Sequence, residues 1–181
     1  MTTPLRRRRR RGARPSIVTL RRPARSQAVP TLRDSFVGYY RWHAKRTLRE
    51  VDQVRAIREG KRVVALVMFE ELVRGVGYVN YLAVARDHRR EGMGKRLLDE
   101  ALAVLRRRGS FIVFSAAARS NRASIALLES RGFRRTRRSE RSWVDGGLGA
   151  WGLRSRMHIV AGEVVLARRW RARARAPSSY L

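Results

Sequence analysis

The chain has 181 residues, which suits one domain with a hydrophobic core of its own, and 44% of them are hydrophobic. Lys and Arg total 43 against 14 Asp and Glu, so the formal net charge is +29. The chain contains no cysteine, which excludes disulfides, thiolate zinc sites and cysteine nucleophiles. No apolar run approaches the ~20 residues that a membrane-spanning helix needs.

Arginine supplies nearly all of the positive charge, since the only lysines are Lys45, Lys61 and Lys95. The arginine fork binds phosphate through two hydrogen bonds and stacks on bases, so this composition favours contact with nucleic acid. A GC-rich genome or a hot habitat also raises arginine at the expense of lysine. Neither of these explains the excess of basic over acidic residues.

Three zones differ in composition. Residues 1–30 contain the run Arg6–Arg11 and no acid, which predicts a basic extended N-terminal tail in which only Ser16–Leu20 suits a strand. Residues 31–167 carry the periodic patterns of a domain and still hold twice as many basic as acidic residues. Residues 168–181 predict a second basic tail. We expect a cytoplasmic protein, with an arginine-rich organelle transit peptide as the alternative explanation of the N-terminus.

The first predicted element is a helix from Thr31 to about Glu59. Thr31 and Asp34 have the spacing of a capping box. Apolar residues then recur every three or four positions and mark one buried face, before Gly60 gives a stop signal. The residues of this face are Val37, Tyr40, Ala44, Leu48, Val51 and Val54.

Strands and helices alternate along the rest of the domain. Runs of β-branched and apolar residues predict strands at Val63–Phe69, Gly75–Val84, Phe111–Ser115, from Phe133, and at His158–Ala167. Helical spacing predicts helices at Gly92–Arg108 and Asn121–Arg131, which Gly109 and Gly132 end. This order indicates an α/β fold in which helices flank a mixed β-sheet.

A glycine-rich turn joins a strand to a helix within Tyr81–Leu98. The first turn of a helix has unpaired N–H groups and the positive end of the helix dipole, and Gly92 and Gly94 let an anion approach them. Three basic residues surround the turn: Arg89, Arg90 and Lys95. The pattern suits a phosphate or pyrophosphate, although a helix start with solvated arginines has the same appearance. Leu97 replaces the third glycine of the dinucleotide fingerprint, and a Walker loop would need Ser or Thr after Gly-Lys.

The segment Arg89-Arg90-Glu91-Gly92-Met93-Gly94 resembles the R/Q-x-x-G-x-G/A signature of GNAT acetyltransferases. Leu82-Ala83-Val84 is similar to the strand before that signature. Asn121 to Phe133 is similar to the family's second segment, which is an asparagine, an apolar helix and Gly-Phe. The resemblance covers Val63–Phe133 by motif and the rest by the order of elements. It implies a splayed mixed sheet, acetyl-CoA as cofactor and transfer of an acetyl group to an amine.

The resemblance also implies roles for the matching positions. The backbone of Leu82–Val84 would hold the pantetheine arm and thioester, and the amides of Arg90–Lys95 would hold the pyrophosphate. Asn121 would hydrogen-bond the cofactor near its sulfur end.

Two positions depart from the family pattern. The acid in this family is commonly a tyrosine seven residues after the asparagine, where this chain has Leu128. A glutamate five residues before the asparagine assists as base in the branch that modifies protein N-termini, where this chain has Ala116. Tyr81, beside the expected thioester, is the candidate acid, with core packing as its other interpretation. We expect His43 to be exposed and His88 to be an ordinary loop residue.

Three functions fit these features. The first is an N-acetyltransferase whose amine acceptor lies on or near nucleic acid, such as a ribosomal protein, a chromatin protein or an RNA base. The second is a protein of the same fold that has lost its chemistry and binds RNA or the ribosome through its basic tails, with Trp143, Trp151 and Trp170 as candidate stacking residues. The third is an acetyltransferase of small amines, which the positive charge disfavours because it repels polyamines.

Overall fold

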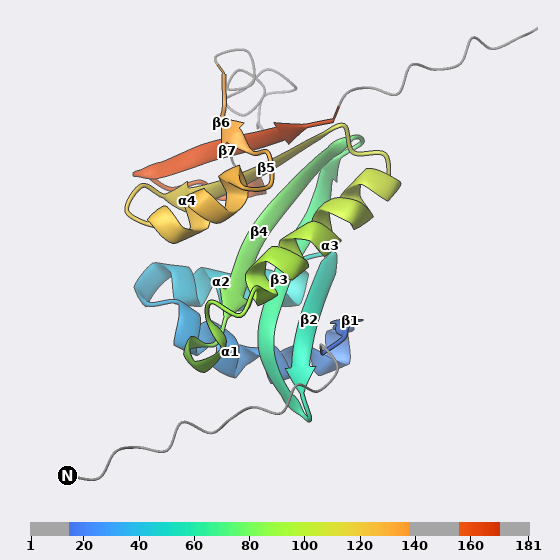
Figure 1. Cartoon of the computed structure of the whole chain (residues 1–181), viewed down its shortest axis with the longest axis vertical. Coiled ribbons are helices and arrows are strands. Elements are labelled where there is room, and N and C mark those ends of the chain that lie inside the picture. The colour runs from blue at the N-terminus through green and yellow to red at the C-terminus, as the bar shows by residue number, and fades with distance from the viewer. Residues whose placement is uncertain (1–14, 138–155, 171–181) are drawn as a thin grey trace, which may run out of the picture.

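The computed structural model describes residues 15–137 and 156–170, which form a seven-stranded sheet in the order β1-β2-β3-β4-β5-β7-β6 with helices around it (Figure 1). The strands are β1 (Ile17–Thr19), β2 (Gln53–Glu59), β3 (Arg62–Val73), β4 (Val76–Val84), β5 (Ile112–Ala118), β6 (Arg134–Arg135) and β7 (Glu163–Arg169). The α-helices are α1 (Val29–Ser35), α2 (Gly38–Glu50), α3 (Met93–Arg107) and α4 (Arg122–Glu129), and the 3₁₀ helices are η1 (Arg22–Ala28) and η2 (Arg86–His88). The predicted α/β fold is confirmed.

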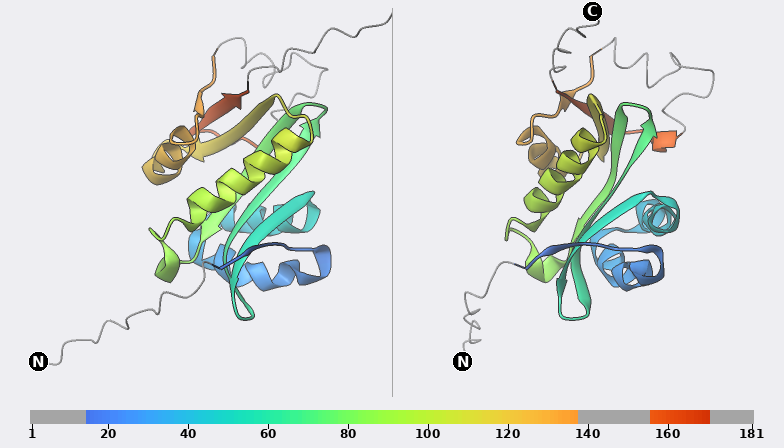
Figure 2. Two further views of the ribbon diagram at one scale, coloured as in Figure 1. Left: turned by 45° about the vertical axis from the view of Figure 1, so that its right-hand side comes forward. Right: turned by 90° about the vertical axis from the view of Figure 1, so that its right-hand side faces the viewer.

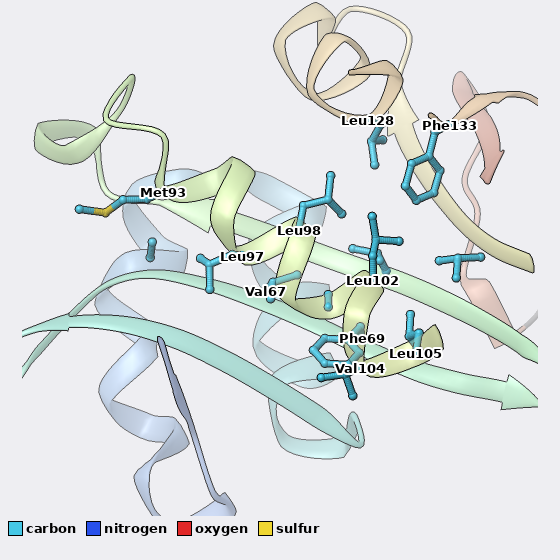
Figure 3. Close-up of a cluster of buried hydrophobic side chains, with 14 of the residues drawn as sticks. Val67, Phe69, Met93, Leu97, Leu98, Leu102, Val104, Leu105, Leu128 and Phe133 are labelled. Carbon is cyan, nitrogen blue, oxygen red and sulfur yellow. The ribbon is translucent and has the colours of Figure 1, made fainter. Parts of the chain in front are cut away.

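Helices cover both faces of the sheet. Figure 2 shows α1 and α2 on one side of the strands β2–β4 and α3 on the other. In Figure 3, Leu97 and Leu105 of α3 lie beside Val67 and Phe69 of β3. Leu98 and Leu102 extend toward Leu128 of α4 and Phe133, which belong to the same core. Because β3 is covered on both faces, every residue from Val63 to Phe69 is buried. This burial explains its continuous apolar run.

Strand pairing changes direction in the middle of the sheet. Strands β1 to β4 pair in antiparallel fashion, and α3 then crosses over to β5, which lies parallel to β4. Only Val76–Val79 of β4 pairs with β5, through Ile112–Ser115. Strand β5 instead pairs along its whole length with β7. The sheet therefore splays within β4, as the family resemblance implies.

The predicted helix from Thr31 to Glu59 is wrong in its second half. Helix α2 ends at Glu50, and residues Gln53–Glu59 form β2, which pairs with β3. Val51 and Val54 are buried as expected. However, the apolar spacing of so short a run fits a strand as well as a helix. Pairing with β3 is what makes this segment a strand. The first half is also interrupted, because Val37 is extended and its side chain is 69% exposed.

The predicted capping box does not form. Helix α1 begins two residues before Thr31, at Val29, with Pro30 in its first turn. The Thr31 hydroxyl donates instead to the carbonyl of Val63 on β3, at 2.5 Å. This bond ties α1 to the sheet.

Parts of both expected tails belong to the folded structure. Residues 17–19 form β1 on the edge of the sheet, and Arg25 is buried, with its guanidinium donating to the carbonyls of Leu48 at 3.0 Å and Val51 at 2.8 Å. These carbonyls lie at the end of α2, where the last helical C=O groups lack intrahelical partners. At the other end, β7 continues to Arg169. Residues 1–14 and 171–181 lie outside the described residues, as do Trp143 and Trp151.

Among the described helices, none has both the length and the apolar character that crossing a bilayer requires.

Candidate active site

The cleft begins where β4 and β5 part. A β-bulge shifts the register of β4, so that Tyr81 lies opposite Met68 and Val79 opposite Phe69, with Asn80 as the extra residue. At the last β4–β5 pair, the Ser115 hydroxyl donates to the Val79 carbonyl at 3.0 Å. Beyond this point Asn80–Val84 has no strand partner on the β5 side within the described residues.

Two backbone amides of the free β4 edge face this opening. The amide of Ala85 donates to the Val64 carbonyl on β3 at 2.9 Å. Amides alternate in direction along a strand, so that of Ala83 also faces β3, and those of Leu82 and Val84 face the opening. The backbone amides of Leu82 and Val84 are therefore directed into the opening. The amide of Ala83 is directed to β3, and the Ala83 side chain lies in the core under α1 and α2.

The loop before α3 has the geometry of an anion cradle. Arg90 and Gly92 have left-handed backbone, with φ of 65° and 77°, and Gly92 precedes the helix with no side-chain cap. Within the part of the chain that the structure describes, no acceptor bonds the amides of Arg90, Gly92, Met93, Gly94 or Lys95. The Met93 side chain is buried and anchors the helix start. The free amides are thus held in place by the core beneath them.

Exposed basic side chains surround these amides, as the sequence predicts. Arg89, Arg90 and Lys95 are all exposed. Gly94 has a different role, since a Cβ there would lie 3.2 Å from Leu82 and 3.5 Å from Leu127. Its missing side chain lets α3 approach β4 and α4 closely. Glu91 lies 3.6 Å from His88, which is buried rather than an ordinary loop residue.

Farther along β4, a cleft of about 150 Å³ opens among α2, β4, β5, α4 and the segment before β7. Tyr81, Leu82 and Asn121 line it. Ala116 and Leu128 also line it, so both departures from the family pattern fall where ionisable side chains were expected.

Tyr81 forms a pair with His43 in this cleft. The Tyr81 hydroxyl is hydrogen-bonded to His43 Nδ1 at 2.7 Å, and the Thr47 hydroxyl lies 3.3 Å from the same nitrogen. Phe36 packs edge-on against the Tyr81 ring, with ring centroids 5.3 Å apart. His43 is only 6% exposed, which corrects the expectation that it is exposed. It is buried because Tyr81 and His158 cover it, a contact between distant segments.

The surroundings shift the pKa values of both partners. Burial lowers the pKa of His43, and repulsion by His158 and Arg46 acts in the same direction, against the opposing effect of Glu50. Burial likewise raises the pKa of Tyr81, assisted by the negative charge of Glu163. At neutral pH the pair therefore holds a neutral imidazole and a protonated phenol.

Two further residues of the cleft come from the end of the chain. Glu163 accepts a hydrogen bond from the Val160 amide at 3.0 Å. Burial raises the pKa of Tyr40, and the nearby Glu163 carboxylate acts in the same direction. His158 stacks edge-on against His43, with centroids 4.6 Å apart. Neither residue belongs to a recognised sequence motif, and both reach the cleft only through the pairing of β7 with β5.

Asn121 lies at the cleft but also has a structural task. It is the N-cap of α4, and its Oδ1 accepts from the Ser124 amide at 3.1 Å. Its side-chain nitrogen is the group left to donate to a ligand. The described residues contain no cluster of three or more His, Asp or Glu side chains suited to a metal ion.

Residues 16–133 match the acetyltransferase (GNAT) family. The chain belongs to this family. GNAT enzymes use acetyl-CoA, so this member's cofactor is acetyl-CoA and its general reaction is N-acetylation. No curated protein matches the chain in sequence.

Solved GNAT structures share its fold. The ribosomal-protein-S18-alanine N-acetyltransferase of Escherichia coli is 20% identical with a TM-score of 0.64, covering 92% of this chain and 99% of that chain. The PaiA N-acetyltransferase of Thermoplasma acidophilum, solved with coenzyme A, is 10% identical with a TM-score of 0.63. The match covers 87% of this chain and 100% of that chain. The IAA acetyltransferase of Bacillus cereus is 16% identical with a TM-score of 0.63. The match covers 86% of this chain and 99% of that chain. At these identities the likeness supports the fold alone.

Proposed function

We propose that this GNAT protein transfers an acetyl group from acetyl-CoA to an amine that a protein or a nucleic-acid-associated molecule presents at the β4–β5 cleft. The observation that supports this most directly is the free edge of β4 beside a row of unbonded amides at the start of α3. An extended pantetheine chain can bond to such an edge, and a pyrophosphate suits such a helix start.

In this proposal the cofactor is held from end to end by groups of three elements. The amides between Arg90 and Lys95 bind the pyrophosphate, and the amides of Leu82 and Val84 bind the pantetheine arm. The side-chain nitrogen of Asn121 donates near the sulfur. Because most of these donors belong to the backbone, they are fixed before the ligand arrives.

Proton handling falls to His43 and Tyr81. Bound acetyl-CoA supplies an activated acyl group and a thiolate leaving group. An acceptor ammonium group gives up two protons in all. Solvent takes the first before the attack, and neutral His43 accepts the second at its other ring nitrogen as the C–N bond forms and the C–S bond breaks. Tyr81 donates its hydroxyl proton toward the departing sulfur and regains one from His43 Nδ1 across their 2.7 Å hydrogen bond. The pair ends with its starting charge, and exchange of the imidazole proton with solvent restores the first tautomer. In this way it replaces the groups missing at Ala116 and Leu128.

The acceptor side of the cleft carries the features of a site for an amine on a larger molecule. Glu163 supplies a carboxylate there, which attracts an ammonium group. Tyr39 of α2 also lines the cleft and is 49% exposed. The net charge of +29 favours an acceptor bound to polyanions and disfavours free polyamines.

Calorimetric titration of acetyl-CoA tests the cofactor site. We expect the wild type to bind and R90E/K95E to bind at least about tenfold more weakly, because two attractive charges become repulsive. The matched control is K61E/R74E, which makes the same changes at two exposed hairpin turns and should bind within about threefold of wild type. A wild type that does not bind acetyl-CoA would refute the proposal.

The acceptor class is tested with radiolabelled acetyl-CoA, offering ribosomal proteins, ribosomal RNA and spermidine separately. We expect label in the ribosomal protein or RNA fraction. Transfer to spermidine in preference to both would contradict the proposed acceptor.

A second candidate function is an RNA- or ribosome-binding protein that lacks chemistry, which Ala116 and Leu128 favour. It predicts no transfer to any of these acceptors, together with RNA binding that weakens steeply with salt.

A further inference from the structure

A second cavity lies at the opposite end of α3 from the glycine-rich loop. It encloses about 700 Å³ between the last turns of α3, the start of β5 and the end of β7. Figure 1 shows the C-terminal ends of α3 and β7 at the same end of the molecule. This groove, here called the α3–β7 groove, shares no lining residue with the β4–β5 cleft. It is therefore a separate site.

The α3–β7 groove has an excess of positive charge. Arg106, Arg107 and Arg168 line it, and its one acidic lining residue is Asp99. Asp99 already pairs with Arg131, at 2.7 Å. Within the described residues no carboxylate forms an ion pair with the three lining arginines. An anion is the ligand class that would neutralise them.

The environment of Arg168 agrees with this charge distribution. Burial lowers its pKa, and repulsion by Arg106 and Arg131 acts in the same direction, while Asp99 only partly offsets these effects. The gathering of like charge is thus unfavourable in the protein alone. Phosphate oxygens would relieve it.

The groove also offers a hydroxyl without a partner and an aromatic ring. Ser110 is 4% exposed, and its Oγ has no hydrogen-bond partner among the described residues. Such a buried donor is satisfied when a ligand oxygen reaches it. Trp170 is half-buried, its amide donates to the Phe111 carbonyl at 3.1 Å, and the Arg168 guanidinium lies 5.3 Å from its ring centroid. This backbone bond and the packing of the ring against the hydrophobic core hold the indole at the wall of the groove.

We propose that the α3–β7 groove binds single-stranded nucleic acid, with phosphates on Arg106, Arg107 and Arg168 and an unpaired base stacked on Trp170. Its volume of about 700 Å³ suits a nucleotide unit. An aromatic platform among arginines is how proteins hold single strands, since every base has a face to stack. Ser110 donates to a phosphate oxygen. The site does not depend on acetyl transfer and stands or falls by its own measurements.

Fluorescence anisotropy with a labelled 12-nucleotide oligouridine and the full chain tests the phosphate contacts. R106Q/R107Q removes two exposed charges from the groove, and R49Q/R74Q removes two exposed charges elsewhere. We expect the groove variant to bind about tenfold more weakly and its log–log salt slope to fall by about 1.4, for two lost phosphate contacts. The control should stay within about threefold of wild type. Equal losses in the two variants would overturn the proposal, because the binding would then reflect overall charge.

Trp170→Leu tests the stacking, with Trp42→Leu as the control at an exposed tryptophan of α2. We expect W170L to weaken binding about tenfold while the salt slope stays unchanged. The quenching of tryptophan fluorescence by RNA should also become smaller in this variant. W42L should keep both affinity and quenching. An unchanged W170L, or an equal loss in W42L, would overturn the proposal. Thermal melts of each variant confirm that the fold persists.

A competition assay distinguishes recognition of a single strand with unpaired bases from binding to phosphate charge alone. Unlabelled oligouridine should displace the probe at lower concentration than an RNA duplex or polyphosphate at equal phosphate. Equal or better competition by either one would overturn the proposal, because neither offers an unpaired base.

Discussion

The Tyr81–His43 pair is the feature on which the proposed chemistry most depends. Each side chain alone has an ordinary structural interpretation, as an aromatic on a strand and a histidine on a helix. Because both line the β4–β5 cleft and share a hydrogen bond of 2.7 Å, we interpret them together as a proton-handling pair. Their pKa shifts in opposite directions keep the imidazole neutral and the phenol protonated at neutral pH, the forms that a base and an acid must have before the reaction.

Tyr81→Phe keeps the ring and removes the proton donor. We expect kcat to fall about 100-fold, within the usual contribution of a positioned acid, while the Kd for acetyl-CoA stays within about twofold. Steady-state kinetics and calorimetry measure the two quantities. A kcat equal to that of the wild type would assign Tyr81 to packing alone.

His43 predicts a pH dependence with a definite sign. Because its pKa lies below the ordinary value of 6.5, the folded protein resists protonation while the unfolded chain accepts it. The stability that the neutral ring contributes is present above pH 6.5 and is lost as the pH falls. Denaturant melts between pH 7.5 and pH 5 should show this fall, and His43→Gln should reduce it.

In kcat profiles the acidic limb should lie below pH 6.5 and be absent in His43→Gln. A limb that remains in the variant would assign the titration to another group.

At the level of elements, the loop between β4 and α3 combines two requirements in one short segment. Gly92 supplies a left-handed residue that turns the chain into the helix with its first amides exposed. Gly94 supplies a close approach to Leu82. The buried Met93 between them fixes the start of α3 to the core.

Gly92→Ala should lower both stability and cofactor affinity, whereas Gly60→Ala should lower stability alone. Both glycines have positive φ, 77° and 57°, and open space where a Cβ would stand. Each alanine therefore costs about 1 kcal/mol of backbone strain. Only relaxation at Gly92 redirects the amides of the loop, so only G92A should raise the Kd for acetyl-CoA. Similar Kd values in both variants would show that the loop does not bind the cofactor.

For the molecule as a whole, the dominant physical property is its charge. At +29 over 181 residues, self-repulsion opposes the compact state. The two proposed sites differ in their local charge, because the β4–β5 cleft contains Glu163, whereas the one acid that lines the α3–β7 groove already pairs with Arg131. Under the two proposals, the groove would attract phosphate and the cleft would attract an ammonium group.

Screening should stabilise this protein, in contrast to one held together by surface ion pairs. We expect Tm to rise by several degrees between 50 and 500 mM NaCl, because salt weakens repulsion between like charges. Scanning fluorimetry measures this rise. A Tm that falls with salt would mean that attractive pairs such as Arg62–Asp87 outweigh the net repulsion.

The sequence by itself determined the features whose causes are local. The helices α3 and α4 were predictable because apolar residues recur at helical spacing over about two turns or more, and because a glycine follows each run. The same holds for β3, β4 and the loop at Gly92, since continuous apolar runs and a glycine's backbone freedom are properties of neighbouring residues. These segments also carried the resemblance to the GNAT family.

Only the tertiary structure decided what depends on residues far apart. The strand β2 exists because it pairs with β3, although its apolar spacing equally suited the helix before it. Arg25 is buried because unpaired carbonyls at the end of α2 receive it. His43 meets Tyr81 across 38 residues, and Glu163 reaches the cleft only because β7 pairs with β5. Local patterns fix which elements form, whereas long-range pairing fixes which side chains meet, and the chemistry of this protein rests on the second.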